Sequence, residues 1–289
     1  YKWRPHETIC LDITNRCNLN CPHCYQIPDN HSTDAPYQTI LDQVRAYTGE
    51  PFNIALMGAE PTVRKDLYDL VNGLRQIPLV DEIIILTNGV NLSDFDYATQ
   101  FSEIPQLAWT IGLNHPDYQG SSIHRKQLEG INNCKKLGLE IKNISYTLES
   151  FDQLDYCLTE IHNFNMPIKY RLRCGANIGR TPSNEKVFLS QSIKQVKKLC
   201  NTNNWSFEQD YDFSNRAHYA SIINGIPIKI IQWPDVTNID LEELQTEAWA
   251  DMVPGHPISP LIHQVILRDG VVNKGIPLKN VIPEKYRRL

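Results

Sequence analysis

The sequence has no long apolar segment and no strong excess of charge of either sign. Of its 289 residues, 28 are Lys or Arg and 33 are Asp or Glu, so the formal net charge is -5. This balance gives no support for a surface that follows nucleic-acid phosphates. The longest apolar runs, such as residues 83–86, are far shorter than the roughly 20 residues that span a bilayer. We therefore expect neither a membrane segment nor a nucleic-acid partner.

Cysteine is also sparse, with eight residues in the whole chain. That number is too small for a disulfide scaffold in a chain of this length. The opening stretch YKWRPHETICLDIT scatters charges among its apolar residues, which is not typical of a secretory signal. We expect a cytoplasmic protein whose cysteines are free or bind a metal.

Short apolar runs alternate with segments of helical spacing through the first two thirds of the chain. The runs predict strands at 8–14, 52–57, 83–86, 107–113, 140–148 and 168–173. Helices are predicted at 40–47, 67–74, from about 94, and at 123–137, 150–164 and 190–200. Such alternation builds a parallel sheet with helices on its outer face. About six units favour an α/β fold, a partial (β/α)6 TIM-like barrel, over the full eightfold form.

The pattern changes after Cys200. Apolar residues flank Asn224-Gly225, a strong signal for a two-residue hairpin, and Asp269-Gly270 is flanked in the same way. An acidic segment, 241–252, is predicted to be helical. We therefore expect a core barrel over residues 1–200 and a small β-rich C-terminal extension over residues 201–289.

Three cysteines follow the first predicted strand at close spacing. Cys17, Cys21 and Cys24 lie in the segment TNRCNLNCPHCY, whose Asn and Pro residues allow the loop to curl. A 4Fe-4S cluster normally takes four cysteines, so three leave one iron open for another ligand. The alternative is a zinc loop with a histidine as fourth ligand, although no second CxxC pair is present. The candidate histidines are His6, His23 and His31.

The spacing Cys-x3-Cys-x2-Cys, followed by Tyr25, resembles the signature of the radical S-adenosylmethionine (SAM) superfamily. The resemblance covers roughly residues 5 to 180 and implies a 4Fe-4S cluster and SAM as cofactors. In that family the open iron is chelated by the methionine part of SAM. An electron from the cluster splits the C5′–sulfur bond, and the resulting 5′-deoxyadenosyl radical abstracts a substrate hydrogen.

A second motif supports the same resemblance at the end of the second predicted strand. Gly58-Ala59-Glu60-Pro61 is similar to the family's Gly-Gly-Glu-Pro turn, whose backbone and Glu contact the SAM ammonium. Glycine at position 58 allows close approach of the backbone, and a carboxylate at 60 complements an ammonium. Ala59 departs from the family pattern, which has a second glycine.

The resemblance implies further cofactor contacts at the ends of later strands. Thr87 and Asn88 lie where the family often has a strand end near the ligand, and Asn114 is placed to bond the ribose. Arg171 and Arg173 resemble family arginines that pair with the SAM carboxylate, and alternation puts both on one face. The loop after Asn114 is expected to line the substrate pocket, with His115 as a weaker acid/base candidate.

The other cysteines separate into two kinds. Cys10, Cys134 and Cys157 lie within predicted strands or helices, where a free cysteine is commonly a small buried hydrophobe. Cys174 follows the last core strand and is a candidate hydrogen donor to a substrate radical. Many peptide-modifying relatives carry a cysteine-rich tail for auxiliary clusters, but no cysteine follows Cys200 here. We therefore expect a single cluster.

The function predicted from this resemblance is hydrogen abstraction from a peptide, as in epimerisation, cross-linking or backbone excision during ribosomal peptide maturation. One alternative is a radical SAM enzyme that acts on a small metabolite or lipid precursor. Another is a non-catalytic iron-sulfur or zinc protein. The resemblance also implies a flavodoxin or ferredoxin-type reductant and, for a peptide substrate, a small substrate-recognition protein.

Overall fold

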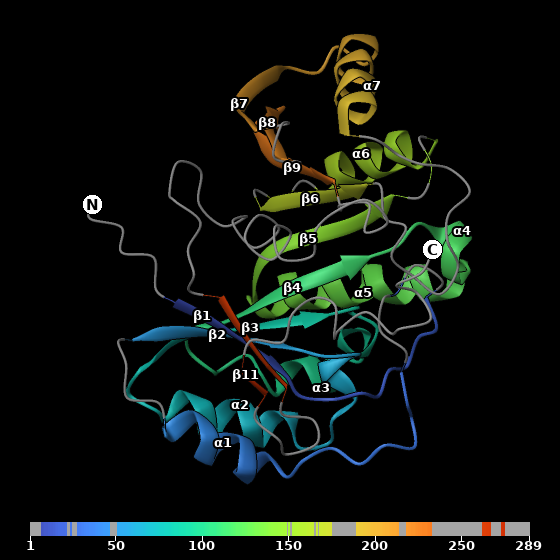
Figure 1. The fold of residues 1–289 in the computed structure, drawn as a ribbon. Coiled ribbons are helices and arrows are strands. Elements are labelled where there is room, and N and C mark those ends of the chain that lie inside the picture. Colours follow the sequence, from blue (N-terminus) through green and yellow to red (C-terminus); the bar gives the residue numbers. More distant parts are fainter. Residues whose placement is uncertain are drawn as a thin grey trace, which may run out of the picture.

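A computed structural model describes most of the chain as one large sheet with helices packed against it (Figure 1). The described residues are 7–21, 24, 28–46, 51–148, 150, 152–164, 166, 168–174, 189–213, 218–232, 262–266 and 273–274. The strands are β1 (Glu7–Asp12), β2 (Phe52–Met57), β3 (Val80–Thr87), β4 (Leu107–Leu113), β5 (Glu140–Leu148), β6 (Lys169–Cys174), β7 (Phe207–Phe213), β8 (His218–Ile223), β9 (Ile226–Gln232), β10 (Ile262–Ile266) and β11 (Asn273–Lys274).

The sheet is mostly parallel and has the strand order β11-β10-β1-β2-β3-β4-β5-β6-β9-β8-β7. The pairings from β10 through β1 to β6 and on to β9 are all parallel, whereas β11 pairs antiparallel with β10, and β8 pairs antiparallel with both β9 and β7. In the described part of the chain β7 and β11 form the two edges, so the sheet stays open. The expected α/β fold of a partial barrel is confirmed, with antiparallel strands added by the C-terminal segment.

The connections between the parallel strands are helical. The helices are α1 (Tyr37–Arg45), α2 (Leu67–Arg75), α3 (Phe95–Thr99), α4 (Pro116–Gln119), α5 (Ser121–Leu137), α6 (Asp152–Phe164) and α7 (Leu189–Thr202), with short 3-10 turns η1 (Pro61–Val63) and η2 (Asn91–Ser93). Local signals set the ends: the Asp94 carboxylate accepts from the N–H of Tyr97 to begin α3, and Gly138 ends α5 in the left-handed conformation.

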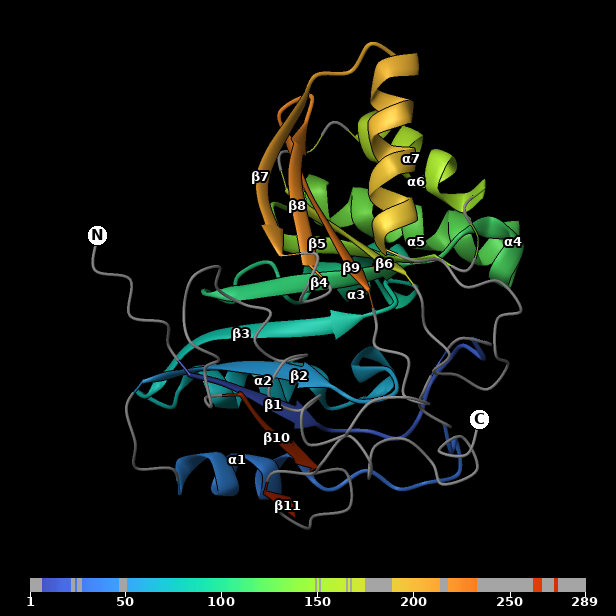
Figure 2. The same ribbon diagram turned by 45° about the horizontal axis from the view of Figure 1, so that its top comes forward.

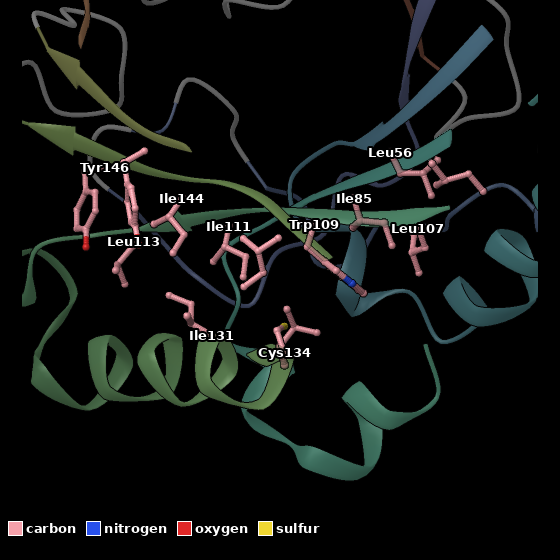
Figure 3. Packing of buried hydrophobic residues seen from close by; sticks show 14 of the residues in the cluster. Leu56, Ile85, Leu107, Trp109, Ile111, Leu113, Ile131, Cys134, Ile144 and Tyr146 are labelled. Atoms are coloured by element: carbon pink, nitrogen blue, oxygen red, sulfur yellow. The ribbon is translucent and has the colours of Figure 1, made fainter. Parts of the chain in front are cut away.

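Alternate residues of each strand divide between two faces of the sheet. Trp109, Ile111 and Leu113 of β4 point towards the helices and pack with Ile131 and Cys134 of α5 (Figure 3). The opposite face carries smaller and more polar buried residues. These include Cys10, Ala55, Ala108, Thr110, Asn143 and Ser145. The main core therefore lies between sheet and helices, and the other face is chemically suited to a polar ligand.

The segment after residue 200 adds strands on both sides of the core sheet (Figure 2). The predicted hairpin is confirmed: β8 and β9 pair antiparallel around Asn224 and Gly225, whose φ angles are 48° and 78°. β9 runs parallel to β6, and β10 runs parallel to β1. The predicted helix at 241–252 and the turn at Asp269-Gly270 lie outside the described residues. The domain boundary at residue 200 stays a prediction.

Among the residues that the structure describes, no helix combines the length and the apolar character needed to cross a bilayer.

A close backbone approach fixes α5 against the end of β3, and this gives a test of the packing. A Cβ at Gly130 would lie 2.4 Å from the carbonyl oxygen of Gly89. We predict that Gly130→Ala destabilises the protein by about 1–3 kcal/mol through overpacking. This cost exceeds the gain in helix propensity of about 1 kcal/mol. The measurement is the free energy of unfolding in urea.

The matched control is Lys126→Ala, which changes an exposed position of the same helix. It should change the free energy of unfolding by less than about 0.5 kcal/mol. A Gly130→Ala protein as stable as the wild type would show that α5 does not approach β3 this closely.

Candidate functional site

The cysteine loop begins where β1 ends. The side chains of Cys17, Cys21 and Cys24 are partly exposed. The N–H of Leu19 donates to the sulfur of Cys17 at 3.3 Å, and the N–H of Cys24 donates to the carbonyl of Cys21 at 3.2 Å. Within the described residues no three His, Cys, Asp or Glu side chains are close enough together to hold a metal ion. The donor set itself, three thiols on one accessible loop, fits a 4Fe-4S cluster with one open iron.

Arg64 joins the two ends of this loop. Its side chain is buried, with the residue 2% exposed. Nη1 donates to the carbonyl of Ile13 at 2.7 Å, and Nη2 donates to the carbonyl of Ala35 at 2.9 Å. The guanidinium also forms a two-point ion pair with Asp66, at 2.9 and 2.8 Å. The loop is thus closed at its base by one planar cation, whose fork geometry suits several acceptors at once.

A second link between the two ends of the cysteine loop joins residues that lie between Ile13 and Ala35 in the sequence. Arg16 forms an ion pair with Asp34, and the hydroxyl of Thr14 donates to the same carboxylate at 2.7 Å. The N–H of Arg16 donates to the hydroxyl oxygen of Thr14 at 3.1 Å. These bonds fix the backbone just before Cys17. Neither link is evident in the sequence, where only the position of Arg64 three residues after Pro61 offers a signal.

The turn after β2 packs against the cysteine loop. Gly58 has a φ of 132°, and a Cβ there would lie 2.5 Å from the carbonyl oxygen of Thr14. The N–H of Ala59 donates to that carbonyl at 2.9 Å, and the N–H of Glu60 donates to the carbonyl of Arg16 at 3.0 Å. Glycine is required at 58 by this close approach. The two sequence motifs, far apart in the chain, are therefore in direct contact.

Glu60 is buried at the centre of the strand ends, with an exposure of 1%. Its Oε1 accepts from the N–H of Thr62 at 3.1 Å, from the hydroxyl of Thr62 at 2.5 Å and from that of Thr87 at 2.6 Å. Its Oε2 accepts from the N–H of Asn88 at 2.7 Å. Burial raises the pKa of Glu60, and these four hydrogen bonds oppose that shift. Oε2 retains capacity for a further donor, such as an ammonium.

Asn88 extends this network back to the cysteine loop. Its Nδ2 donates to Asn18 Oδ1 at 2.7 Å, and Asn18 Nδ2 donates to Asn91 Oδ1 at 3.1 Å. The hydroxyl oxygen of Thr87 accepts from the N–H of Gly89 at 3.0 Å. The cysteine loop, the turn after β2 and the turn after β3 thus form one hydrogen-bonded unit. Five predicted site residues belong to it or to its turn: Gly58, Ala59, Glu60, Thr87 and Asn88.

The remaining predicted site residues lie around this unit. Pro61 is buried and begins η1. Asn114 follows β4 and is 8% exposed, with its carbonyl bonded to a histidine of α5. Arg171 is partly buried on β6, opposite Ser145 of β5. Arg173 and Cys174 belong to β6 by their backbone, but their side chains lie outside the described part of the structure.

Comparison with known families identifies the first half of the chain. The model of the "Radical SAM superfamily" matches residues 11–153. A GTP 3′,8-cyclase of Clostridium perfringens is 32% identical over 207 residues, which cover 68% of this chain and 63% of the relative. A GTP 3′,8-cyclase of Listeria welshimeri is 27% identical over 148 residues, or 47% of this chain and 44% of the relative. The chain thus spans less than half the length of that relative.

Comparison with solved structures shows the same fold over nearly the whole chain. The structure of Streptococcus suis SuiB bound to precursor peptide SuiA has a TM-score of 0.61 at 11% identity, and the match covers 98% of this chain and 66% of SuiB. SuiB bound to S-adenosylmethionine has a TM-score of 0.56 at 12% identity, with coverage of 91% and 58%. At these identities the likeness concerns the fold alone.

The hydrogen bonds from Arg64 to Ile13, Ala35 and Asp66, called the Arg64 clasp below, predict what a substitution of Arg64 does to stability and to iron binding. Arg64→Lys keeps the charge but cannot reach Ile13, Ala35 and Asp66 together, so buried carbonyls lose their donors. We expect a loss of about 3 kcal/mol in unfolding free energy. We also expect reduced iron content after anaerobic reconstitution, since the base of the cysteine loop opens. Iron and sulfide assays with the visible absorbance spectrum measure the second effect.

The control is Arg45→Lys, which changes an exposed arginine paired with Asp42 on α1. Its iron content and stability should equal those of the wild type. If Arg64→Lys takes up iron normally, the Arg64 clasp does not support the cysteine loop.

Proposed function

The chain belongs to the radical SAM superfamily, and from this premise we propose that it is an enzyme that cleaves SAM reductively and abstracts hydrogen from a peptide. The observation that supports the first step is the direct bonding of the Gly58 turn to the cysteine loop. It brings the proposed iron ligands and the proposed SAM contacts to the same ends of parallel strands, where sites of barrel-type folds gather.

Each residue has a separate task in this proposal. Cys17, Cys21 and Cys24 would hold the 4Fe-4S cluster, and Glu60 would accept the SAM ammonium at Oε2, beside its bond from the N–H of Asn88. Asn114 would bind the ribose, and Arg171 and Arg173 would pair with the SAM carboxylate. When bound, the cluster and SAM supply a 5′-deoxyadenosyl radical that removes a substrate hydrogen. A flavodoxin or ferredoxin-type protein supplies the electron.

The competing proposal is a non-catalytic iron-sulfur or zinc loop. A zinc site would need a fourth ligand. His31 is exposed, and its backbone N–H donates to the side chain of Asp29. His6 and His23 lie outside the described residues. The carboxyl group of Glu60 beside an accessible cysteine loop favours the enzyme, since it offers the SAM ammonium an acceptor close to the proposed cluster.

SAM cleavage tests the proposed activity directly. We predict that the anaerobically reconstituted protein forms 5′-deoxyadenosine from SAM with dithionite. Cys17→Ala, Cys21→Ala and Cys24→Ala should each reduce this product to background, because the cluster loses a ligand. Chromatography of the quenched reaction measures the product.

The matched control is Cys134→Ala, which changes a buried cysteine of α5. It should retain product formation. A wild-type protein that binds one zinc per chain, or that holds iron and forms no 5′-deoxyadenosine, would rule out the proposed activity.

We propose a peptide as substrate because the sheet outside the matched region is built from strands that a peptide can use. Three C-terminal strands, β7, β8 and β9, extend the sheet beyond β6, and β-rich segments recognise extended peptides by edge pairing. SuiB, which shares the fold, is described with a bound precursor peptide. A small substrate-recognition protein would assist in this case. The curated relatives named as GTP 3′,8-cyclases support the alternative, a small metabolite or lipid precursor.

The rate of 5′-deoxyadenosine formation separates these substrates, and deuterium incorporation tests Cys174 as the hydrogen donor. We predict that a candidate precursor peptide increases 5′-deoxyadenosine formation above the substrate-free rate, whereas GTP does not. If the reaction is an epimerisation, the product made in D2O carries deuterium at one Cα, and Cys174→Ala abolishes this label. Mass spectrometry measures both. Stimulation by GTP alone would contradict the peptide proposal, and unchanged labelling in Cys174→Ala would exclude that donor.

A further inference from the structure

A buried polar cluster joins the end of β4 to helices α5 and α6. His124, in the first turn of α5, is 6% exposed. Its Nδ1 lies 2.8 Å from the carbonyl oxygen of Asn114, and its Nε2 lies 2.8 Å from Glu160 Oε1. The hydroxyl of Tyr156 donates to Glu160 Oε1 at 2.9 Å, and that of Tyr146 donates to Oε2 at 2.7 Å. Every member of the cluster is therefore tied to the carboxylate of Glu160 or to the strand end.

The partners of His124 favour its charged form. The carbonyl oxygen of Asn114 and the ionised carboxylate of Glu160 both accept, so an imidazolium satisfies them from both ring nitrogens, and the hydroxyl of Tyr156 also lies 3.0 Å from Nε2. Burial opposes this charge, but the hydrogen bond and the charge of Glu160 raise the pKa of His124 above its usual value. Burial alone would raise the pKa of Glu160, and the bonds from His124 and the two tyrosines lower it instead. The raised pKa of His124 and the lowered pKa of Glu160 both favour an ion pair between these two side chains.

The two tyrosines and the thiol near His124 do not compete for this role. Burial and the charge of Glu160 raise the pKa of both Tyr146 and Tyr156, so both stay neutral. The same causes raise the pKa of the Cys157 thiol on α6. On α4, Asp117 acts on Tyr156 through its charge, and the ring of His115 stands edge-on to Tyr156 at 4.5 Å. Within the cluster around Glu160, the proton whose loss breaks the charged link to Asn114 is therefore that of His124.

A second side chain of α5 acts on neighbouring strand ends. Gln127 lies one turn after His124 and is fully buried. Its Nε2 donates to the carbonyl of Asn88 at 2.9 Å and to that of Gly112 at 3.0 Å. Through these two residues, α5 holds the backbone after β3 and at the end of β4. Both strand ends carry proposed SAM contacts, Asn88 and Asn114.

We infer that His124 is a positioning residue for SAM binding, and that it acts by holding the Asn114 carbonyl between α5 and α6. This inference rests on the proposed function. Fixing the carbonyl fixes the backbone of Asn114 and therefore the Cα–Cβ bond from which its side-chain amide extends. Displacement of a positioned group by about 1 Å can cost as much as about 100-fold in rate or affinity. His124 itself does not touch the cofactor.

The sign of the pH effect follows from the raised pKa of His124. The charged link is fully present below the ordinary pKa of histidine, and it is lost as the pH rises through the raised value. The neutral ring can donate from only one nitrogen, so it releases either Asn114 or Glu160. SAM binding should therefore weaken on the alkaline side.

The test measures the KM for SAM and kcat for 5′-deoxyadenosine formation across the neutral and alkaline range, with dithionite and the reconstituted full chain. We expect His124→Gln to raise the KM for SAM about 10-fold near neutral pH and to change kcat by less than about threefold. Its KM should no longer depend on pH in this range. Glu160→Gln keeps the shape but removes the charge that stabilises the imidazolium. The rise in KM should then begin at lower pH than in the wild type.

The control is His162→Gln, which changes a histidine of α6 that stacks on Trp205 away from this cluster. It should keep the wild-type KM and pH profile, and iron content should be equal in all variants. A wild type that forms no 5′-deoxyadenosine overturns the proposed function. An active wild type with unchanged KM and pH profile in His124→Gln overturns only the positioning role. If His124→Gln does not fold, Glu160→Gln decides: a pH profile identical to the wild type overturns the inference.

Discussion

The close approach between the turn after β2 and the loop after β1 is the constraint on which the candidate site depends. A side chain at Gly58 would collide with the Thr14 carbonyl, so only glycine permits this contact. The approach lets the N–H groups of Ala59 and Glu60 satisfy loop carbonyls, and it places Arg64 where it reaches both ends of the loop. Buried polar groups require partners. Loop and turn therefore reach their places together, and each is incomplete without the other.

Most of the fold was predictable because its signals are local. Strands β2, β4 and β5 begin and end at the predicted residues, since β2 and β4 are mostly apolar runs and β5 places apolar residues among polar ones near strand spacing. Asn224-Gly225 predicted its hairpin because these residues tolerate positive φ. The contact between the cysteine loop and the Gly58 turn was predictable only through the family resemblance. The spacing of the three cysteines alone indicated a metal site, but it did not indicate that the Gly58 turn would contact this site.

The polar links were not predictable, because their partners are distant backbone atoms or side chains on other elements. Arg64 precedes a charged pair, Lys65 and Asp66, so its sequence context is that of a surface residue. Its burial follows from carbonyls at both ends of a loop that the sequence does not show to be close. The pairing of β9 with β6 was hidden for the same reason: the strands are separated by a helix and two other strands.

The residues proposed for SAM cleavage and those proposed for substrate choice lie in different parts of the sheet. The network around Glu60, from Asn18 to Asn91, lies entirely within the matched residues 11–153. The face that carries Ser145 continues beyond them through Arg171 on β6 and Lys229 on β9, which are register partners. Substitutions on β6 and β9 can change this end of the face without breaking any bond of the Glu60 network. Under the proposed function, the cluster ligands and the acceptor for the SAM ammonium therefore belong to the first half, whereas β6 would supply the contacts to the SAM carboxylate and the later strands would determine substrate choice.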